Sequence, residues 1–396
     1  MENKTITKGN EYIMSSYSRF PLVLEKGEGV YLYDDKGKKY LDFVAGIAVN
    51  CLGYAHPAFV KAITEQLQKM NHVSNLYWTK PQVETAELLV KYSGLDQVFF
   101  CNSGAEAVES ALKLSRIYSE KNKGQDCYEI IGMNKSFHGR TMGALSLTGQ
   151  EKYHANLAPL LPTVKRVEFN NLQDLKSQIS ERTSAIILEP IQGEGGIYPV
   201  DIDYLKQVRK ICDEQDIVLI FDEVQTGIGR TGSLFAYQEL GVVPDIVTFA
   251  KGLGNGIPIG GIIAKKKFSK EFTPGTHAST FGGNSISTTA AKVVLTEIME
   301  NGVLESVKEK GNHLKKSLEE LKNSFDTIVD IRGMGLIQGI EVTAPVGVIV
   351  NKAMEKGLLL VSSGANVIRF VPPLIITIEQ IDEGIAILKS VLGEIE

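Results

Sequence analysis

Three short stretches of this chain carry residues whose types could do chemistry together. Residues 102–106 (NSGAE) bring small residues to the start of a helix-like run, where backbone N–H groups and the Ser103 hydroxyl could hold a phosphate. Asp222 follows an apolar run, and a carboxylate there could pair with a cationic ring nitrogen and keep it protonated. Lys251 follows another apolar run, and its amine could form a Schiff base if desolvation lowers its pKa.

Each feature also has an ordinary structural explanation. Ser103 with Glu106 three residues later is typical of a capping box at a helix N-terminus. Asp222 stands beside Glu223, and acids directly after a strand are often turn or cap residues. A lysine at a strand end, such as Lys251, usually extends into solvent. For any one feature alone, the structural explanation is at least as good as the functional one.

The combination of the three features favours chemistry. Each follows an apolar run of strand length, and the carboxyl ends of parallel strands meet at one edge of a sheet, where ligands collect. A phosphate cradle, an acid and a lysine at three such ends are what a phosphorylated pyridinium cofactor requires. We therefore expect Lys251 to bind such a cofactor covalently and Asp222 to pair with its ring nitrogen.

The elements that position these residues alternate along the chain between strands and helices. Helical patterns cover residues 105–118 and 204–212. The apolar runs that predict buried strands lie at residues 98–101, 185–188, 218–221 and 246–249. Strands that alternate with helices predict right-handed βαβ units and a mostly parallel sheet.

The fold class expected from this pattern is α/β, with a large domain built on the parallel sheet and a smaller α+β domain. At 396 residues, two domains are the usual number. A hairpin is predicted at residues 30–37 (VYLYDDKG), and a long charged helix at 303–323 begins the small domain. We expect an N-terminal segment that packs with the small domain, a large cofactor-binding domain and a C-terminal small domain, at residues 1–50, 51–300 and 301–396.

Composition excludes several classes of protein. The chain is 43% hydrophobic and 22% charged, which is ordinary for a globular enzyme. Its net charge of -5 gives no reason to expect nucleic acid as a partner. Lys265, Lys266 and Lys267 form a tight basic run, which we interpret as a solvated strand end.

The cysteines and the apolar runs exclude further classes. No C-x-x-C pair occurs among the scattered cysteines, so neither a metal site nor a disulfide framework is expected from Cys51, Cys101, Cys127 and Cys212. The apolar runs are far shorter than a membrane span. The polar start, MENKTITKGN, lacks the apolar stretch of a signal peptide. We therefore expect a cytoplasmic protein without a membrane partner.

Nine segments, in one order along the chain, match the pattern of a known family. They are GVYLYDDKGKKYLDFVAGIAVNCL at 29–52, SNLYWTKPQ at 74–82, FCNSGAEAVE at 100–109, SFHGRT at 136–141, LEPIQGEGG at 188–196, FDEVQTGIGRTG at 221–232, FAKGLG at 249–254, HASTFGGN at 277–284 and NVIRFVPP at 366–373. With these segments the chain resembles the class III (ornithine-type) aminotransferases of pyridoxal-phosphate fold type I over nearly its whole length.

The resemblance implies pyridoxal 5'-phosphate as the cofactor. Lys251 and Asp222 would be the catalytic residues, Phe137 would stack on the pyridine ring, and Gln225 would hydrogen-bond near its phenolic oxygen. Thr280 would complete the phosphate site from a partner subunit, so a homodimer with shared active sites is expected. The implied cofactor-binding residues are Ser103, Gly104, Ala105, Phe137, Asp222, Glu223, Val224, Gln225, Lys251 and Thr280.

The resemblance also implies the residues that bind the substrates. Arg140 would clamp a substrate carboxylate, with Ser279 nearby, because a planar guanidinium suits bidentate recognition of carboxylates. Glu189 would neutralise Arg369 during the first half-reaction and release it to bind 2-oxoglutarate in the second. For His138 and Tyr17, a role at the site and a packing role are both open.

The activity implied is a transamination between a small amino acid and a 2-oxo acid. The expected reaction converts N2-acetyl-L-ornithine and 2-oxoglutarate to N-acetyl-L-glutamate 5-semialdehyde and L-glutamate, a step of arginine biosynthesis. Ornithine, succinylornithine, succinyldiaminopimelate and 4-aminobutyrate are alternative donors. An aminomutase or a decarboxylase with the same lysine and aspartate is a further alternative, and a non-catalytic cofactor-binding protein ranks last because Lys251 and Asp222 are both present.

Two stretches depart from the common family pattern. Ser285 follows HAST-FGGN where the family often has proline, and this change is expected to affect the stiffness of the loop more than its chemistry. Residues 362–364 (SSG), shortly before Arg369, are also not the commonest version. Both departures bear on the choice of substrate rather than on the cofactor.

Overall fold

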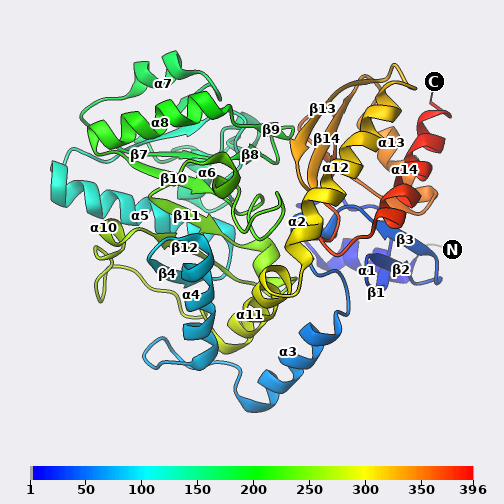
Figure 1. Cartoon of the computed structure of the whole chain (residues 1–396), viewed down its shortest axis with the longest axis horizontal. Helices are drawn as coiled ribbons and strands as arrows, with labels where there is room; N and C mark the ends of the chain where they lie inside the picture. Colours follow the sequence, from blue (N-terminus) through cyan, green and yellow to red (C-terminus); the bar gives the residue numbers. More distant parts are fainter. Residues whose placement is uncertain (1–2, 396) are drawn as a thin grey trace.

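The computed structural model describes residues 3–395, and within them a seven-stranded sheet forms the centre of the larger part of the molecule (Figure 1). Parallel pairing joins β11 to β10, β10 to β7, β7 to β5 and β5 to β6, whereas β12 runs antiparallel to both of its neighbours. The mostly parallel sheet expected from the sequence is therefore confirmed. Its strands, in spatial order, are β4 (Gln97–Cys101), β12 (Gly260–Ala264), β11 (Ile246–Phe249), β10 (Val218–Asp222), β7 (Thr183–Leu188), β5 (Glu129–Met133) and β6 (Val164–Val167).

Both faces of this sheet are covered because its strands are apolar on both sides. On one face, α5 (Gly104–Lys123) packs against alternate strand residues such as Ile187, Ile220 and Ile246. On the other face, α8 (Ile202–Gln215) packs with the intervening residues, including Ile186, Leu219 and Val247. Continuous apolar strands of this kind are typical of a sheet enclosed between two helical layers.

Further helices surround the same sheet and connect it to the rest of the chain. α11 packs against α3 and α4, and lies below the sheet in Figure 1. The remaining elements of this part are α2 (Ala45–Ala48), α3 (Pro57–Lys69), α4 (Lys80–Ser93), α6 (Met142–Leu147), α7 (Leu172–Gln178), α9 (Tyr237–Leu240), α10 (Lys266–Ser269), α11 (Ser285–Met299), the 3-10 helices η1 (Glu151–Tyr153) and η2 (Lys251–Gly254), and the hairpin of β8 (Ile191–Gln192) and β9 (Tyr198–Pro199).

The C-terminal part is a separate layer of helices on an antiparallel sheet, as Figure 1 shows at the right. α12 and α14 pack against each other, and α12 also packs on β13. The strands in order are β13 (Ile328–Met334), β14 (Ile337–Val342), β17 (Val367–Phe370) and β16 (Val361–Ser363). The helices are α12 (Val303–Lys322), α13 (Val346–Glu355) and α14 (Ile378–Leu392).

The N-terminal segment belongs in space to this C-terminal part. After α1 (Lys4–Tyr12), the strands β1 (Leu24–Glu28), β2 (Tyr31–Asp34) and β3 (Lys39–Asp42) form a meander. β3 then pairs in parallel with β15 (Leu358–Leu359), so strands from the two ends of the chain share one sheet. This pairing places the N-terminal strands beside the C-terminal part, and the domain boundaries at residues 50 and 300 stay a prediction. No helix within residues 3–395 is long and apolar enough to cross a membrane.

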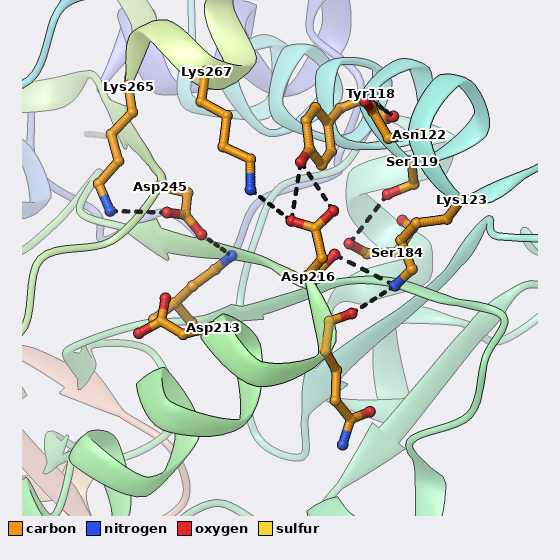
Figure 2. A network of polar contacts seen from close by, with 12 residues as sticks. Tyr118, Ser119, Asn122, Lys123, Ser184, Asp213, Asp216, Asp245, Lys265 and Lys267 are labelled. Carbon is orange, nitrogen blue, oxygen red and sulfur yellow. Dashed lines mark hydrogen bonds and ion pairs between the residues drawn. The ribbon is translucent and has the colours of Figure 1, made fainter.

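The amino ends of β10 and β11 are tied together by a network of ion pairs (Figure 2). Asp245 accepts from Arg209 at 3.0 Å and from Lys265 at 2.9 Å, and Asp216 accepts from Lys267 at 2.6 Å. Lys265 and Lys267 of the basic run are thus ion-paired, whereas the Lys266 side chain makes no ion pair within residues 3–395. These contacts lie at the edge of the sheet opposite to the predicted site, and Asp245 also accepts from the Leu219 N–H of β10 at 2.9 Å.

Candidate active site

A cavity of about 320 Å³ opens at the carboxyl edge of the large sheet. Strands β4, β10 and β11 end there, and the antiparallel β12 begins there. Nine residues expected at the site line it: Ser103, Gly104, Ala105, Phe137, Glu189, Asp222, Val224, Gln225 and Lys251. Residues that are distant in the sequence therefore meet because parallel strands end at one edge.

Lys251 occupies the point where β11 passes into η2. Its φ is 41°, in the left-handed region that non-glycine residues rarely adopt, and such strain is often found at functional residues. The Lys251 amine makes no hydrogen bond or ion pair with any residue between 3 and 395. Burial lowers the pKa of Lys251 below its ordinary value, and the positive charge of Arg369 adds to this effect. An unpaired amine with a lowered pKa is suited to covalent attachment of a carbonyl compound.

Asp222, the last residue of β10, is held in place by three hydrogen bonds. Its Oδ1 accepts from the Thr248 hydroxyl at 2.9 Å and from the Val224 backbone N–H at 3.1 Å. Its Oδ2 lies 2.6 Å from Nδ1 of His138. His138, whose role the sequence left open, is thereby placed behind Asp222, and it also lines the cavity. These contacts fix the orientation of a carboxylate that is 4% exposed.

The N-terminus of α5 forms a cradle for an anion. Ser103 is the N-cap residue, and its hydroxyl accepts from the Glu106 N–H at 3.2 Å. Within the described chain, the N–H groups of Gly104 and Ala105 have no acceptor, and the 20-residue helix directs its positive end at the cavity. A Cβ at position 104 would lie 2.8 Å from Val224, so only glycine allows this approach. Ser103 is therefore an N-cap residue, but the Glu106 carboxylate accepts from the Asn102 N–H and does not complete a capping box. Phosphate binding at this turn stays a prediction.

These observations match the demands of pyridoxal 5'-phosphate. Lys251 would form the covalent link, Asp222 would face the ring nitrogen, and the start of α5 would hold the phosphate. Phe137 lines the cavity and provides an aromatic wall for the ring. One cavity thus contains an unpaired lysine, an oriented carboxylate and an unsatisfied helix N-terminus, which together fit a phosphorylated pyridinium compound.

Arg140 is a free cation next to the cavity. It is exposed, and its guanidinium stacks over the ring of Tyr153 at 3.8 Å and lies 5.6 Å from that of Phe137. It makes no ion pair with any part of the chain that the structure describes. Glu109 fixes the following helix, α6, because its carboxylate accepts from the Thr141 hydroxyl at 2.7 Å and the Gly143 N–H at 3.0 Å. Arg140 is therefore free to meet a substrate carboxylate.

Arg369 is buried, and its anionic partner differs from the one expected. Its Nη1 donates to the Glu194 carboxylate, to the Gly193 carbonyl at 2.9 Å and to Oε1 of Gln225 at 3.0 Å. Glu194, not Glu189, therefore neutralises Arg369 in this structure. The motif LEPIQGEGG contains both acids, and the pattern alone does not show which of them reaches Arg369.

The environment of Glu189 explains this correction. Its carboxyl group accepts from the Phe137 N–H at 3.1 Å and lines the cavity. Burial first, and the charge of Asp222 second, raise the pKa of Glu189 well above its ordinary value. Glu194 is also desolvated, but the charges of Arg369 and Lys251 outweigh this and lower its pKa. Burial thus disfavours the charged form of Glu189, whereas Arg369 and Lys251 stabilise the anionic form of Glu194.

Glu223 is not at the cofactor site as expected. Side chains alternate along a strand, so Glu223 points away from the cavity that Asp222 faces. Its carboxylate accepts from the backbone N–H groups of Ala236 at 2.7 Å and Tyr237 at 2.9 Å, and from Thr226 at 2.8 Å. Glu223 therefore holds the segment that follows β10, which is a structural role.

Three other predicted residues lie outside the cavity of a single chain. Ser279 does not line the cavity, but its hydroxyl accepts at 3.1 Å from the side chain of Asn102, which does. Thr280 is exposed on the surface, and Tyr17 is 72% exposed and lines a different cavity. Thr248 and Asn102 support the site but were not predicted, because a strand residue and a turn residue carry no distinctive signal.

Comparison with known proteins agrees with this site. The family described as Aminotransferase class-III matches residues 12–392. Acetylornithine aminotransferases from Clostridium acetobutylicum and Caldanaerobacter subterraneus are 51% and 52% identical, over 96% and 98% of this chain and 98% and 99% of theirs. The ornithine aminotransferase structure from Toxoplasma gondii has a TM-score of 0.96 at 29% identity, and covers 100% of this chain and 96% of that one.

A second solved structure extends the comparison. The acetylornithine aminotransferase from Elizabethkingia anophelis has a TM-score of 0.88 at 32% identity, over 98% of each chain. The family match, the long relatives and the solved folds all span the cofactor cavity and both parts of the molecule. The chain therefore belongs to the class III aminotransferases, and its cofactor is pyridoxal 5'-phosphate.

Proposed function

We propose that this enzyme transfers the terminal amino group of N2-acetyl-L-ornithine to 2-oxoglutarate, giving N-acetyl-L-glutamate 5-semialdehyde and L-glutamate. The observation that carries the proposal is a pair of arginines around one unpaired lysine: Arg140 is free, whereas Arg369 is neutralised by Glu194. The names of the relatives that share about half of their residues with this chain support the same donor.

The two arginines suit two substrates that differ at the reacting carbon. The carbon that carries the donor amine is a CH2 group without a carboxylate, so an unpaired cation beside it would be unfavourable. The reacting carbon of 2-oxoglutarate carries a carboxylate instead. Arg369 paired with Glu194 would accept the first substrate, and Arg369 released from Glu194 would bind the second in the bidentate manner that guanidinium favours. Arg140 would bind the distant carboxylate of either substrate.

Lys251 is the proposed general base and acid. When bound, the cofactor provides an electron sink that stabilises negative charge at the substrate carbon. The Lys251 amine, once displaced by the donor, would take a proton from that carbon and deliver it to the carbon on the other side of the amino nitrogen. Its lowered pKa favours the neutral, proton-accepting form of the amine more than in an ordinary lysine.

Asp222 serves the reaction by holding the ring nitrogen in its protonated form. His138 and Thr248 keep the carboxylate pointing at the cavity through contacts of 2.6 Å and 2.9 Å. Because His138, Thr248 and the Val224 N–H already orient the Asp222 carboxylate, the site needs little reorganisation when charge develops in the reaction. Phe137 would hold the ring from one side, and the N–H groups of Gly104 and Ala105 would bind the phosphate.

We also propose that a second copy of the chain completes the site. Thr280 is exposed next to Phe281, which is 60% exposed, and Trp78 is 90% exposed. The Asn75 side chain donates to the Ser279 carbonyl at 3.1 Å and the Gly282 carbonyl at 2.9 Å. These hydrogen bonds join the segment that contains Trp78 to the segment that contains Phe281, and the exposed aromatic side chains of the two segments form one apolar surface. A surface of this kind is typical of a subunit interface.

A panel of donors tests the reaction. Purified enzyme with 2-oxoglutarate should form glutamate from N2-acetyl-L-ornithine with a higher kcat/KM than from ornithine, succinylornithine, succinyldiaminopimelate or 4-aminobutyrate. A higher kcat/KM for another donor would overturn the acetylated substrate. Turnover without 2-oxoglutarate would indicate a mutase, and release of carbon dioxide would indicate a decarboxylase.

A further inference from the structure

The hairpin of β16 and β17 places Ser363 on the same face as Arg369. The strands pair so that Val361 lies opposite Arg369, Ser362 opposite Ile368 and Ser363 opposite Val367. Since side chains alternate along each strand, Ser363 and Arg369 share one face and Ser362 lies on the other. Burial agrees with the register, because Ser363 is buried, at 2% exposure, and Ser362 is exposed.

Ser363 binds both ends of the loop that carries Glu194. Its hydroxyl donates to the Gly193 carbonyl at 2.7 Å and accepts from the Gly196 N–H at 2.9 Å. The next residue, Gly364, donates its N–H to the Glu194 carbonyl at 3.2 Å. Three hydrogen bonds from one strand end therefore fix the backbone of residues 193–196.

The same loop supplies the partners of Arg369. The Gly193 carbonyl accepts from both Ser363 and Arg369, at 2.7 Å and 2.9 Å. The Glu194 side chain, which is 23% exposed, accepts from Arg369 and also from Gln225 at 3.1 Å. The Nε atom of Arg369 has no partner among residues 3–395, so this arginine retains capacity to bind a ligand.

We propose that Ser363 is a positioning residue that sets how firmly Arg369 is held by residues 193–196, and thereby sets the balance between the two substrates. With the loop fixed, Gly193 and Glu194 are presented to Arg369, and the paired state that accepts an uncharged aminomethyl end is favoured. With the loop loosened, Arg369 is released more easily toward a carboxylate. The proposal rests on the proposed function, since it requires one substrate with and one without a carboxylate at the reacting carbon.

The test is Ser363→Ala in the holoenzyme, with the two half-reactions measured separately by the absorbance of the cofactor. We expect KM for N2-acetyl-L-ornithine to rise and KM for 2-oxoglutarate to fall, each by between about twofold and about tenfold, the range for one neutral hydrogen bond. The value of kcat should change less. Ser363→Thr, which keeps the hydroxyl, should restore the balance, and Ser362→Ala should behave like the unchanged enzyme.

Opposite changes in the two half-reactions distinguish positioning from a general structural role. Parallel losses in both, no change in either, or the same effect from Ser362→Ala would each overturn the proposal. Should Ser363→Ala fail to fold, Ser363→Cys provides the same comparison with a much weaker hydrogen-bonding group. The half-reactions of the unchanged enzyme are measured first. If N2-acetyl-L-ornithine fails as a donor, this first measurement shows it. The test of Ser363 then uses the donor that the panel identifies.

Discussion

At the scale of single residues, burial decides what each charged group in the cavity does. Glu189 and Glu194 are five positions apart and chemically identical, yet their pKa values move in opposite directions. Glu189 is enclosed near Asp222, whereas Glu194 lies against Arg369. The charged form is therefore disfavoured in Glu189 and stabilised in Glu194, and Glu194 is the acid that pairs with Arg369.

The two acids should respond differently to loss of charge. Glu194→Gln leaves Arg369 buried with less compensation, so kcat/KM for the uncharged end of N2-acetyl-L-ornithine should fall by at least about tenfold, in keeping with loss of one partner of a buried ion pair. Glu189→Gln removes a carboxyl group that makes no ion pair within residues 3–395, and should change kcat/KM by less than about threefold. Half-reaction kinetics measure both. Similar losses of kcat/KM in Glu194→Gln and Glu189→Gln would contradict the assignment of Glu194 as the anion that pairs with Arg369.

Lys251 makes the stability of the cofactor-free protein depend on pH. Burial lowers its pKa in the folded chain, whereas the unfolded chain keeps its proton up to the ordinary value of 10.5. Between these two pKa values the unfolded state binds more protons, so the free energy of unfolding rises with pH. This contribution is absent at low pH and complete above pH 10.5.

Urea unfolding of the cofactor-free protein at several pH values measures this effect. Lys251→Met removes the titrating group and should flatten the rise in stability between pH 7 and pH 10, while it abolishes trapping of the cofactor by borohydride. Lys292→Met, at a lysine with an exposed ion pair, serves as the control and should leave the slope unchanged. An equal slope for Lys251→Met and the unchanged chain would refute the lowered pKa.

At the scale of elements, helix termini do much of the positioning. The start of α5 forms the anion cradle, Glu109 caps α6 directly after Arg140, and Asn284 caps α11 through the N–H groups of Ile286 and Ser287. Each cap satisfies donors that a helix cannot pair internally. Ser285, the departure from the family pattern, is the first helical residue of α11.

Ser285→Pro should stabilise the chain. Proline is favoured at the first helical position, and Asn284 already has the extended conformation, with φ of -60° and ψ of 159°, that precedes a proline. The buried Ser285 hydroxyl has no partner in the described range, so its loss removes no hydrogen bond. We expect a gain of about 0.4–1 kcal/mol in the free energy of unfolding. Urea unfolding checks this, with Ser285→Ala as control; lower stability for the proline variant alone would show overpacking.

At the scale of the whole molecule, the carboxyl and amino edges of the large sheet carry different features. The carboxyl edge carries the cofactor cavity, and the amino edge carries the paired charges around Asp216 and Asp245 (Figure 2). The C-terminal part lies at the right of Figure 1. Its residue Arg369, on β17, donates at 3.0 Å to Gln225, which lines the cavity. The site thus depends on both parts of one chain and, in our proposal, on a second chain.

Two surface variants should separate assembly from cofactor binding. Trp78→Asp places a charge in the proposed interface and should shift the chain toward monomer, with loss of affinity for pyridoxal 5'-phosphate. Thr280→Ala should keep the dimer but weaken the binding of the cofactor, because in our proposal Thr280 contacts the phosphate from the second chain. Sedimentation velocity and cofactor titration measure the two properties. A monomeric unchanged enzyme, or full cofactor affinity in a Trp78→Asp monomer, would refute the shared site.

The periodicity of the apolar residues and the order of the apolar runs were enough to predict the central sheet of the larger part. The apolar runs at 185–188, 218–221 and 246–249 became neighbouring strands because alternating strands and helices have few ways to pack. Their ends placed Lys251 and Asp222 at one cavity. Helix boundaries were less predictable: α5 extends to Lys123, beyond the expected residue 118, since its last turn is stabilised by contacts of Lys123 with distant carbonyls.

The sequence by itself therefore predicted that Ser103, Asp222 and Lys251 meet at one cavity, because each stands next to a strand end. Only the tertiary structure decided which acid neutralises Arg369, which of Asp222 and Glu223 faces the cavity, and that His138 and Ser363 support the site. The physical reason is that these contacts join segments far apart in the chain, and the charge of each buried group depends on what folding places around it.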